Sequence, residues 1–572
     1  MTEPSGWTGH EVAELRHRTE VWIADDPDPF SRAELQGVLA GLPASLTDLA
    51  DRFAGRLSFG TAGLRGALGA GPNRMNRVVV TQAAAGLVAH LLKNTTAPRV
   101  VVGYDARRNS DVFAADTAEI VQGAGGEALL LPEPLPTPVL AYAVRALGCD
   151  AGVMVTASHN PPQDNGYKVF LGDGSQIVPP ADEQIAAEID RAAERGLSTL
   201  PRDDAYTRLG DEVRADYVDA VVATVAPGPR DLRVVHTALH GVGAQVVDEV
   251  LKRAGFDDRH AMAEQAAPDP DFPTVAFPNP EEPGAIDLAE SLAAKVDADL
   301  VIANDPDADR CAVVVPDPLA RGGWRMLHGD EVGVLLADTL LLAGQAGAYA
   351  TTIVSSSMLG RLVAAHRAAG ADVSYAETLT GFKWLTKVED VRYGYEEALG
   401  YCVAPDLVLD KDGISAALLM CDLAARLRAD GRGLADRLDD LAREHGVHAT
   451  DQLSVRVDDL SLIASAMERL RADPPTRLGG LAVERVDDLA EGSVESTGLP
   501  PTDGIRLVLA EDGRVVVRPS GTEPKLKAYL EVVVPVESVA DEEADDAVQA
   551  ARIAAAGRLD AIKADLSPAL GL

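Results

Sequence analysis

Two kinds of apolar segment alternate between residues 78 and 158. In longer segments the apolar residues recur every three or four positions, as in helices, and in shorter segments they are continuous, as in buried strands. Helices are predicted at residues 83–92, 114–121 and 138–147, and strands at 100–102, 128–131 and 152–155. This βαβαβ order predicts a parallel sheet covered by helices on both faces. Ligands bind beyond the carboxyl ends of such strands, where residues 156–161 lie.

The same alternation recurs twice further along, although no residue-level repeat of fixed period is visible. Between residues 232 and 312, strands are predicted at 234–239 and 300–303, and helices at 244–254 and 285–294. Between residues 330 and 428, helices are predicted at 331–342 and 358–369, and strands at 352–355 and 373–375. The Pro-rich stretches 132–138 and 268–283 are interpreted as loops within these units.

The last part of the chain has a different pattern. Apolar strands at 505–509 and 515–517 flank Asp512-Gly513, a hairpin signal, and a strand at 526–533 and an Ala-rich helix at 545–562 follow. We therefore predict an α/β protein with three similar mixed α/β domains and a C-terminal α+β domain. The predicted boundaries are 1–220, which includes an N-terminal extension, then 221–325, 326–448 and 449–572.

Composition narrows the classes of function. The 572 residues are 47% hydrophobic, which suits roughly four globular domains of ~150 residues. The net charge of -37 argues against nucleic acid or an anionic membrane as the main partner. We see no signal peptide and no bilayer span, and the four cysteines form no CxxC pair. We expect a cytoplasmic protein with reduced thiols, either a monomer or a homodimer.

The first chemical motif, at residues 156–162, reads Thr-Ala-Ser-His-Asn-Pro-Pro and follows a predicted strand. A strand-end loop exposes the hydroxyl of Ser158 to a substrate, and Pro161 and Pro162 stiffen the backbone that holds it. Alternatively, Ser158 and Asn160 only satisfy backbone groups in a turn.

The second motif, at residues 304–310, reads Asn-Asp-Pro-Asp-Ala-Asp-Arg and also follows an apolar strand. Three carboxylates at alternating positions converge on one side of an extended loop, which favours a divalent cation. An EF-hand is excluded because it needs Gly at Arg310 and Glu at Pro316. The alternative is an acidic surface loop.

Three further loops are polar or Gly-rich. Residues 518–527, Arg-Pro-Ser-Gly-Thr-Glu-Pro-Lys-Leu-Lys, offer an Arg, hydroxyls and a Gly to an anion, although the Walker spacing is absent. Residues 59–66 form a Gly-rich loop containing Arg65, and residues 393–400 offer glutamates suited to sugar hydroxyls. Each loop alone is also compatible with an ordinary turn or a solvated surface.

In this order, the motifs closely resemble those of the α-D-phosphohexomutase family, the phosphoglucomutases and phosphomannomutases, from about Phe59 to Val534. The resemblance implies four domains around a central cleft. It implies that Ser158 is a phosphoserine, and that Arg65, His159, Lys168 and Arg310 assist catalysis. Mg²⁺ would be held by Ser158, Asp305, Asp307 and Asp309. His240 would lie in a loop beside the cleft. The residues implied to bind substrate are Thr380, Gly381, Lys383, Glu396, Glu397, Arg518, Ser520, Gly521, Thr522 and Lys527.

The activity implied by the resemblance is the interconversion of the 1-phosphate and 6-phosphate of glucose or mannose. The phosphoserine phosphorylates the free hydroxyl of a phosphosugar, and the bisphosphate turns over and returns its other phosphate. A sugar bisphosphate would serve as activator. Positioning and charge stabilisation are the main requirements of such phosphoryl transfer.

Other activities remain open at this point. Many relatives have Ser where this chain has Ala398, and the sequence looks more like the long-chain branch that includes phosphopentomutases and sugar-bisphosphate synthases. A phosphopentomutase or a sugar-1,6-bisphosphate synthase is therefore the alternative function. An aspartyl-phosphate phosphatase would use Asp305 as nucleophile, but Asp309 stands where it needs Thr or Val. A non-catalytic sugar-phosphate sensor would be expected to have lost one of these loops, and none is lost.

Overall fold

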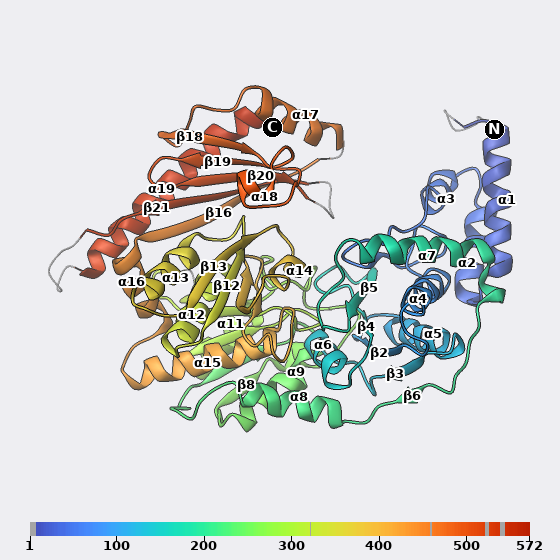
Figure 1. Ribbon diagram of the computed structural model, residues 1–572, viewed down its shortest axis with the longest axis horizontal. Helices are drawn as coiled ribbons and strands as arrows, with labels where there is room; N and C mark the ends of the chain where they lie inside the picture. Colours follow the sequence, from blue (N-terminus) through green and yellow to red (C-terminus); the bar gives the residue numbers. More distant parts are fainter. Residues whose placement is uncertain (1–6, 321, 458–459, 521–524, 538–543, 572) are drawn as a thin grey trace. The chain divides into compact units, whose positions relative to one another are not determined.

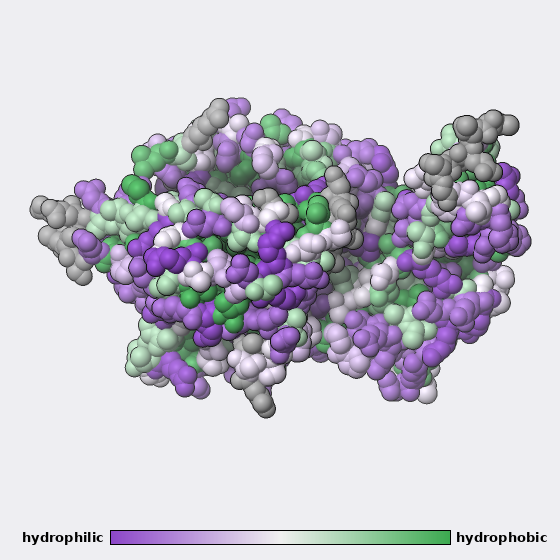
Figure 2. Space-filling model, turned by 90° about the horizontal axis from the view of Figure 1, so that it is seen from above, coloured by the Kyte–Doolittle hydropathy of each residue, from purple (hydrophilic) through white to green (hydrophobic). Residues whose placement is uncertain are grey.

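The computed structural model describes residues 7–320, 322–457, 460–520, 525–537 and 544–571. The described residues contain four β-sheets with helices packed on them (Figure 1), which agrees with the predicted four-domain α/β architecture. The chain divides into two compact units, Met1–Trp324 with Asp406–Leu418, and Arg325–Pro405 with Leu419–Leu572. Among the described helices, none combines the length and apolarity needed to cross a membrane. Hydrophilic side chains cover much of the face in Figure 2, because the apolar ones fill the cores.

Three helices precede the first sheet: α1 (Gly9–Asp25), α2 (Pro29–Ala40) and α3 (Leu46–Arg52). Their buried faces form a small separate core that includes Leu35, Leu49 and Phe53. Thr8 caps α1 through a capping box with Glu11. The N-terminal extension is thus a folded helical subdomain.

The first sheet has the order β1-β5-β4-β2-β3-β6. Its strands are β1 (Leu64–Ala67), β2 (Arg99–Tyr104), β3 (Glu127–Leu130), β4 (Ala151–Val155), β5 (Asp164–Leu171) and β6 (Thr207–Arg208). The associated helices are α4 (Arg77–Leu91), α5 (Ser110–Gly123), α6 (Thr137–Ala146), α7 (Ala181–Arg195) and the 3-10 helix η1 (Leu197–Thr199). Strands β2, β3, β4 and β6 are parallel as predicted, but β5 is antiparallel to its neighbour β4, and β1 pairs antiparallel with β5. The sheet is therefore mixed.

The second sheet has the order β11-β10-β9-β7-β8. Its strands are β7 (Val234–Thr237), β8 (Arg259–Ala261), β9 (Leu300–Ala303), β10 (Ala312–Pro316) and β11 (Trp324–Met326). Its helices are α8 (Glu212–Val222), α9 (Gly243–Arg253), α10 (Ala263–Ala266) and α11 (Asp287–Val296). Because β9 and β10 are antiparallel neighbours, the acidic loop that joins them turns back at the sheet end.

The third sheet has the order β13-β12-β14-β15. It contains β12 (Gly347–Thr352), β13 (Val373–Thr378), β14 (Val391–Glu396) and β15 (Gly400–Cys402), with helices α12 (Gly329–Leu342), α13 (Met358–Ala368), α14 (Phe382–Leu385), α15 (Gly413–Ala429) and α16 (Leu434–His445). The strand predicted at 352–355 was misplaced, since β12 ends at Thr352. Residues 353–355 form a turn in which Ser355 N donates to Thr352 O.

The fourth sheet, antiparallel in every pair described, has the order β16-β21-β20-β19-β18-β17. Its strands are β16 (Val447–Arg456), β17 (Arg477–Leu478), β18 (Leu481–Asp488), β19 (Ile505–Leu509), β20 (Arg514–Pro519) and β21 (Lys525–Val534), and its helices are α17 (Leu460–Ala472), α18 (Val494–Thr497) and α19 (Ala544–Leu570). The hairpin predicted at Asp512-Gly513 forms between β19 and β20. Glu511 and Asp512, rather than the glycine, adopt the left-handed conformation.

Candidate active site

Ser158 lies directly after β4, in the loop that was predicted at the carboxyl end of this strand. It is buried, with φ of 51°, an unusual value for a residue other than glycine. The Ser158 N–H donates to Thr156 Oγ1 at 2.9 Å, and the Ser158 hydroxyl donates to Asp305 Oδ2 at 2.6 Å. The serine hydroxyl therefore points at the acidic loop of the second sheet, within the same unit.

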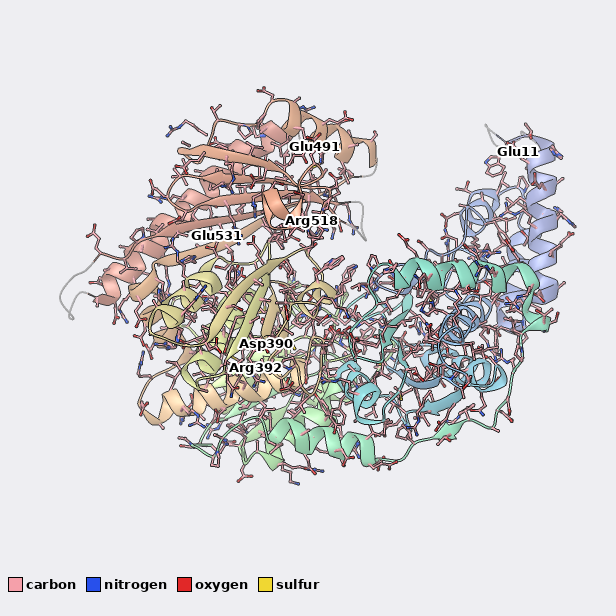
Figure 3. The ribbon with its side chains drawn as sticks, viewed as in Figure 1. Glu11, Asp390, Arg392, Glu491, Arg518 and Glu531 are labelled. Carbon is pink, nitrogen blue, oxygen red and sulfur yellow. The ribbon has the colours of Figure 1, made fainter. Side chains whose placement is uncertain are left out.

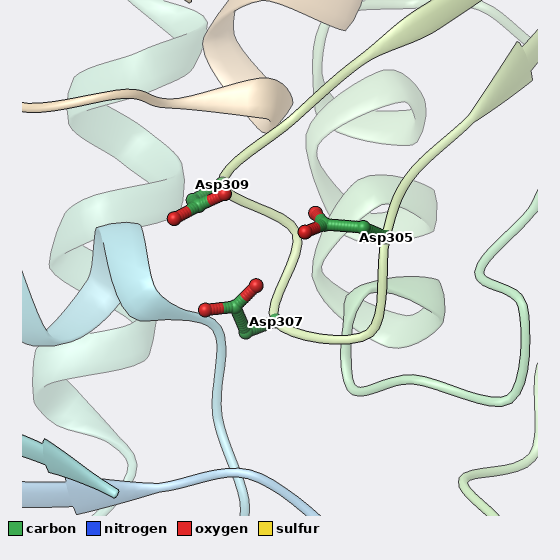
Figure 4. A group of neighbouring side chains, drawn as sticks. All are labelled: Asp305, Asp307 and Asp309. Atoms are coloured by element: carbon green, nitrogen blue, oxygen red, sulfur yellow. The ribbon is translucent and has the colours of Figure 1, made fainter. Parts of the chain in front are cut away.

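Asp305, Asp307 and Asp309 lie in the loop between β9 and β10 (Figure 4). All three have no exposed surface, and one ligand atom from each can be chosen so that all lie within 4.8 Å of one another. The alternative of an acidic surface loop is therefore wrong. Buried carboxylates this close repel one another strongly unless cations compensate their charges.

Two lysines provide part of that compensation. Lys168 Nζ, from β5, lies 2.7 Å from Asp307 Oδ2 and 2.8 Å from Asp309 Oδ2. Lys411 Nζ lies 3.3 Å from Asp309 Oδ2, on the segment Asp406–Leu418 that packs in this unit. Although burial opposes ionisation, the neighbouring lysines hold the pKa of Asp309 below its ordinary value.

Arginines and a histidine complete the surroundings of Ser158. Arg310 Nε lies 3.9 Å from Asp305 Oδ2, and Arg65 Nη1 donates to Asn160 Oδ1 at 3.3 Å. His159 Nδ1 lies 3.4 Å from Ser158 Oγ. Burial, together with the positive charges of Arg310 and Arg65, lowers the pKa of His159 well below its ordinary value, so its imidazole is neutral at pH 7.

The carboxylates retain oxygens that could bind a cation. Asp307 Oδ1 and Asp309 Oδ1 are buried and make no hydrogen bond within the described part of the chain. Lys168 occupies the Oδ2 atoms of the same two residues, and Asp309 Oδ1 has Arg310 Nε at 3.8 Å, beyond hydrogen-bond distance, so both Oδ1 atoms could still bind a metal ion. Hard oxygen ligands in this number suit Mg²⁺, which is usually bound by a few carboxylates plus a phosphate oxygen.

The predicted sugar-binding residues lie in the other unit. Thr380 and Gly381 follow β13, and Gly381 has φ of 105°, where a side chain would be strained. Lys383, in α14, lies 5.7 Å from the ring centre of Trp384. Glu396 is the last residue of β14.

Glu397, the residue after Glu396, has hydrogen-bond partners from its own unit. Its Oε2 accepts from Ser355 Oγ at 3.1 Å and from Thr352 Oγ1 at 3.4 Å. Burial raises the pKa of Glu397 to about 7, with a further contribution from Glu396. Glu397 therefore changes its charge near neutral pH.

The predicted phosphate-binding loop joins β20 to β21 in the fourth sheet. Arg518 and Lys527 are direct partners across these antiparallel strands, and Figure 3 shows Arg518 near the end of its strand. Like charges directly opposite each other are destabilising, so this pair favours an anion as neighbour. Ser520 N donates to Lys525 O. The predicted residues Gly521 and Thr522 lie outside the described residues.

Tyr529 connects the two predicted substrate loops of this unit. Burial raises its pKa, the charge of Glu397 adds to that increase, and the positive charge of Arg518 opposes it. Its ring belongs to an apolar cluster with Leu379 and Val516, against which Trp384 packs.

The sequence analysis did not identify three residues near these sites: Tyr529, Lys411 and Thr137. The Thr137 hydroxyl donates to Asp307 Oδ2 at 2.7 Å. Of these three, only Lys411 could have been noticed in the sequence, because it lies between Asp410 and Asp412. His240, in turn, is buried in its loop, with Nε2 2.8 Å from Thr274 Oγ1.

Comparison with family descriptions gives four matches in order along the chain. They are the α/β/α domains I, II and III of phosphoglucomutase/phosphomannomutase, over residues 56–196, 215–321 and 328–445, and the C-terminal domain over residues 453–556. The N-terminal helices α1 to α3 precede the first match.

Individual proteins also match over most of the chain. A "Probable phosphomannomutase" of Haemophilus influenzae is 48% identical, covering 80% of this chain and 93% of its own length. A phosphopentomutase of Mus musculus is 34% identical, covering 91% of both chains. A solved structure of a phosphoglucomutase/phosphomannomutase family protein from Burkholderia thailandensis shares the fold, with a TM-score of 0.67, 20% identity and coverage of 90% and 97%.

Proposed function

Because this chain belongs to the phosphoglucomutase/phosphomannomutase family, we propose that it interconverts the 1-phosphate and 6-phosphate of glucose, mannose or both through a phosphorylated Ser158. Such an enzyme is an isomerase that acts as an intramolecular phosphotransferase. The observation that carries the proposal is the 2.6 Å hydrogen bond from the Ser158 hydroxyl to Asp305, inside a buried group of three carboxylates and several cations.

In the proposed first half-reaction, the sugar hydroxyl attacks the phosphorus of phosphoserine 158. The new phosphorus–oxygen bond forms while the bond to Ser158 Oγ breaks. The attacking hydroxyl approaches phosphorus from the side opposite Ser158 Oγ. The neutral His159 lies beside Ser158 Oγ and is therefore suited to hydrogen-bond to this leaving oxygen while it takes up the proton that the attacking hydroxyl releases. Lys168 and Arg310 stabilise the charge on the transferring group. The second half-reaction reverses these steps with the other phosphate of the bisphosphate.

Magnesium fits the carboxylates of Asp305, Asp307 and Asp309, where two buried Oδ1 atoms have no hydrogen-bond partner among the described residues. When bound, Mg²⁺ would withdraw charge from a phosphoserine oxygen and so make the phosphorus more electrophilic. Arg65, whose pKa is lowered by burial and by Arg310, adds positive charge on the serine side.

The second unit would bind the rest of the substrate. Arg518, Ser520 and Lys527, with the undescribed Gly521 and Thr522, are proposed to hold the phosphate that is not transferred. Thr380, Gly381, Lys383, Glu396 and Glu397 are proposed to bind the sugar hydroxyls. In this proposal the bisphosphate turns over in a central cleft, which excludes water and limits hydrolysis. A sugar bisphosphate would reactivate enzyme that has lost its phosphate.

Pentose phosphates are the second candidate substrates. Ala398 removes a hydroxyl from the sugar loop, and a similar mouse protein is named a phosphopentomutase. The sugar-1,6-bisphosphate synthase alternative would share Ser158 but release the bisphosphate. We further propose that the protein works in the cytoplasm as a monomer or homodimer and binds neither nucleic acid nor membranes.

Intact-mass measurement tests the mechanism directly. Wild-type protein incubated with glucose 1,6-bisphosphate should gain one phosphate at Ser158, and Ser158→Ala should gain none. The variant should stay folded and lose mutase turnover by several orders of magnitude, because the loop offers no second nucleophile. Near-normal turnover in Ser158→Ala would refute the mechanism. Comparing kcat/KM for glucose, mannose and ribose 1-phosphates would identify the substrate class.

A further inference from the structure

Arg107 is a buried side chain that takes no part in the mechanism above, yet it is hydrogen-bonded to the loop that carries Ser158. It lies between β2 and α5, in the first sheet. Its Nη2 donates to Ser158 O and Asn160 O, both at 2.6 Å. Its Nη1 donates to Pro161 O at 2.8 Å and to Asp164 O at 3.2 Å. One guanidinium thus binds three backbone carbonyls of the loop and the first carbonyl of β5.

These contacts leave Arg107 without a donor for substrate. A guanidinium has five N–H groups. Four of them are directed at the carbonyls, and the fifth, on Nε, is buried 3.4 Å from Asp105 Oδ2 and makes no hydrogen bond with the described residues. Asp105 is itself fixed, because its Oδ1 accepts from Ser110 Oγ at 2.7 Å and from the Arg107 N–H at 2.9 Å. Apart from its positive charge, Arg107 can therefore affect the reaction only through the loop backbone.

The loop needs such a partner. Four carbonyl oxygens that converge on one point repel one another unless a cation lies between them. Ser158 also has a left-handed backbone, which persists only where the surroundings enforce it. Without the guanidinium, the loop would relax and move Ser158 Oγ away from Asp305.

The Pro-rich segment 268–283, which the mechanism above leaves without a role, covers this arginine. Phe272 is buried, and its ring centre lies 5.0 Å from the guanidinium carbon of Arg107. The neighbouring Asp271 forms an ion pair with Arg108, whose side chain is half exposed. The segment comes from the part of the chain that carries the acidic loop, so it ties that part to the serine loop within one unit.

We propose that Arg107, held under Phe272, is the positioning residue that fixes Ser158 for phosphoryl transfer. This inference rests on the proposed function, since it assumes that Ser158 carries the phosphoryl group. A displacement of about 1 Å at a reacting atom costs on the order of a hundredfold in rate. Arg107 therefore acts on the transfer step and not on substrate binding.

The test compares Arg107→Lys with Arg108→Lys. Both keep the charge, but a lysine presents its donors from one nitrogen and cannot bind four carbonyls in a plane. We expect Arg107→Lys to lower kcat and the single-turnover transfer from phosphoserine 158 by about a hundredfold, with KM within threefold of wild type. Arg108→Lys should match wild type. Phe272→Leu keeps an apolar side chain over Arg107 but removes the aromatic ring, and it should lower kcat several-fold. This variant tests the proposal if Arg107→Lys does not fold.

Three results would overturn the inference: a kcat for Arg107→Lys within threefold of Arg108→Lys, a loss confined to KM, or, where Arg107→Lys does not fold, unchanged kcat in Phe272→Leu. The proposed function is checked separately by the wild-type protein. Wild type that gains no phosphate at Ser158 after incubation with glucose 1,6-bisphosphate would refute that function. Phosphorylated, active wild type with an Arg107→Lys variant of unchanged kcat would refute only the role of Arg107.

Discussion

Replacing Arg518 with alanine separates phosphate binding from the chemistry at Ser158. A bidentate, charge-assisted pair between a guanidinium and a phosphate contributes about 1.5–3 kcal/mol. Since each ~1.4 kcal/mol is tenfold in affinity, Arg518→Ala should weaken apparent substrate affinity roughly ten- to a hundredfold. Arg518→Lys should lose less, because it keeps the charge and loses only the bidentate geometry.

The stability of the free protein should change little in Arg518→Ala. The variant loses the electrostatic interaction of Arg518 with Tyr529, but it also relieves the repulsion from Lys527 directly opposite, about 0.2–1 kcal/mol. These effects have opposite signs. The two free proteins should therefore have similar Tm values. Inorganic phosphate should raise the Tm of wild type more, because only wild type keeps Arg518 to bind it.

The assay is a substrate titration of wild type, Arg518→Ala, Arg518→Lys and Arg485→Ala, with magnesium affinity measured for each. Arg485 is the matched control, since it is exposed on β18 of the same sheet and pairs with Asp487. Magnesium affinity should be unchanged in all variants, because the three aspartates belong to the other unit. An Arg518→Ala variant that loses magnesium binding and keeps substrate affinity would refute the assignment of this loop.

Three other substitutions test the remaining assignments. Asp307→Asn should weaken the dependence on magnesium and the activity together, measured by activity against free Mg²⁺, and activity indifferent to chelation would contradict the metal site. Burial raises the pKa of Glu397 in the folded state to about 7, so the folded state favours the protonated carboxyl. The resulting stabilisation is fully present below pH 4.5 and is lost as the pH rises through 7. The free energy of unfolding, measured by urea titration, should fall by about 2.5 kcal/mol between pH 5 and pH 8 in wild type but not in Glu397→Gln. Arg514→Met should cost about 3–5 kcal/mol in urea unfolding because Glu531, 2.8 Å from Arg514, loses its buried arginine, whereas Glu377 keeps Arg506; an unchanged midpoint would contradict that.

The sequence by itself determined the architecture and the strand-end loops. Apolar periodicity is local, so helices such as α5 and strands such as β9 could be predicted from their own residues. Polar residues directly after an apolar strand identified both the Ser158 loop and the acidic loop. The ends of strands were predicted less well. The strand expected at 352–355 is in fact β12, which ends at Thr352.

Only the tertiary structure decided which distant residues meet. Strand β5 inserts antiparallel beside β4 and delivers Lys168 to Asp307, and the segment Asp406–Leu418 delivers Lys411 to Asp309. The tertiary structure likewise brings Arg107 to the backbone of the loop that carries Ser158. A charged side chain is buried only where partners from other segments offset its desolvation. That balance depends on distances between segments far apart in the chain, which no local pattern contains.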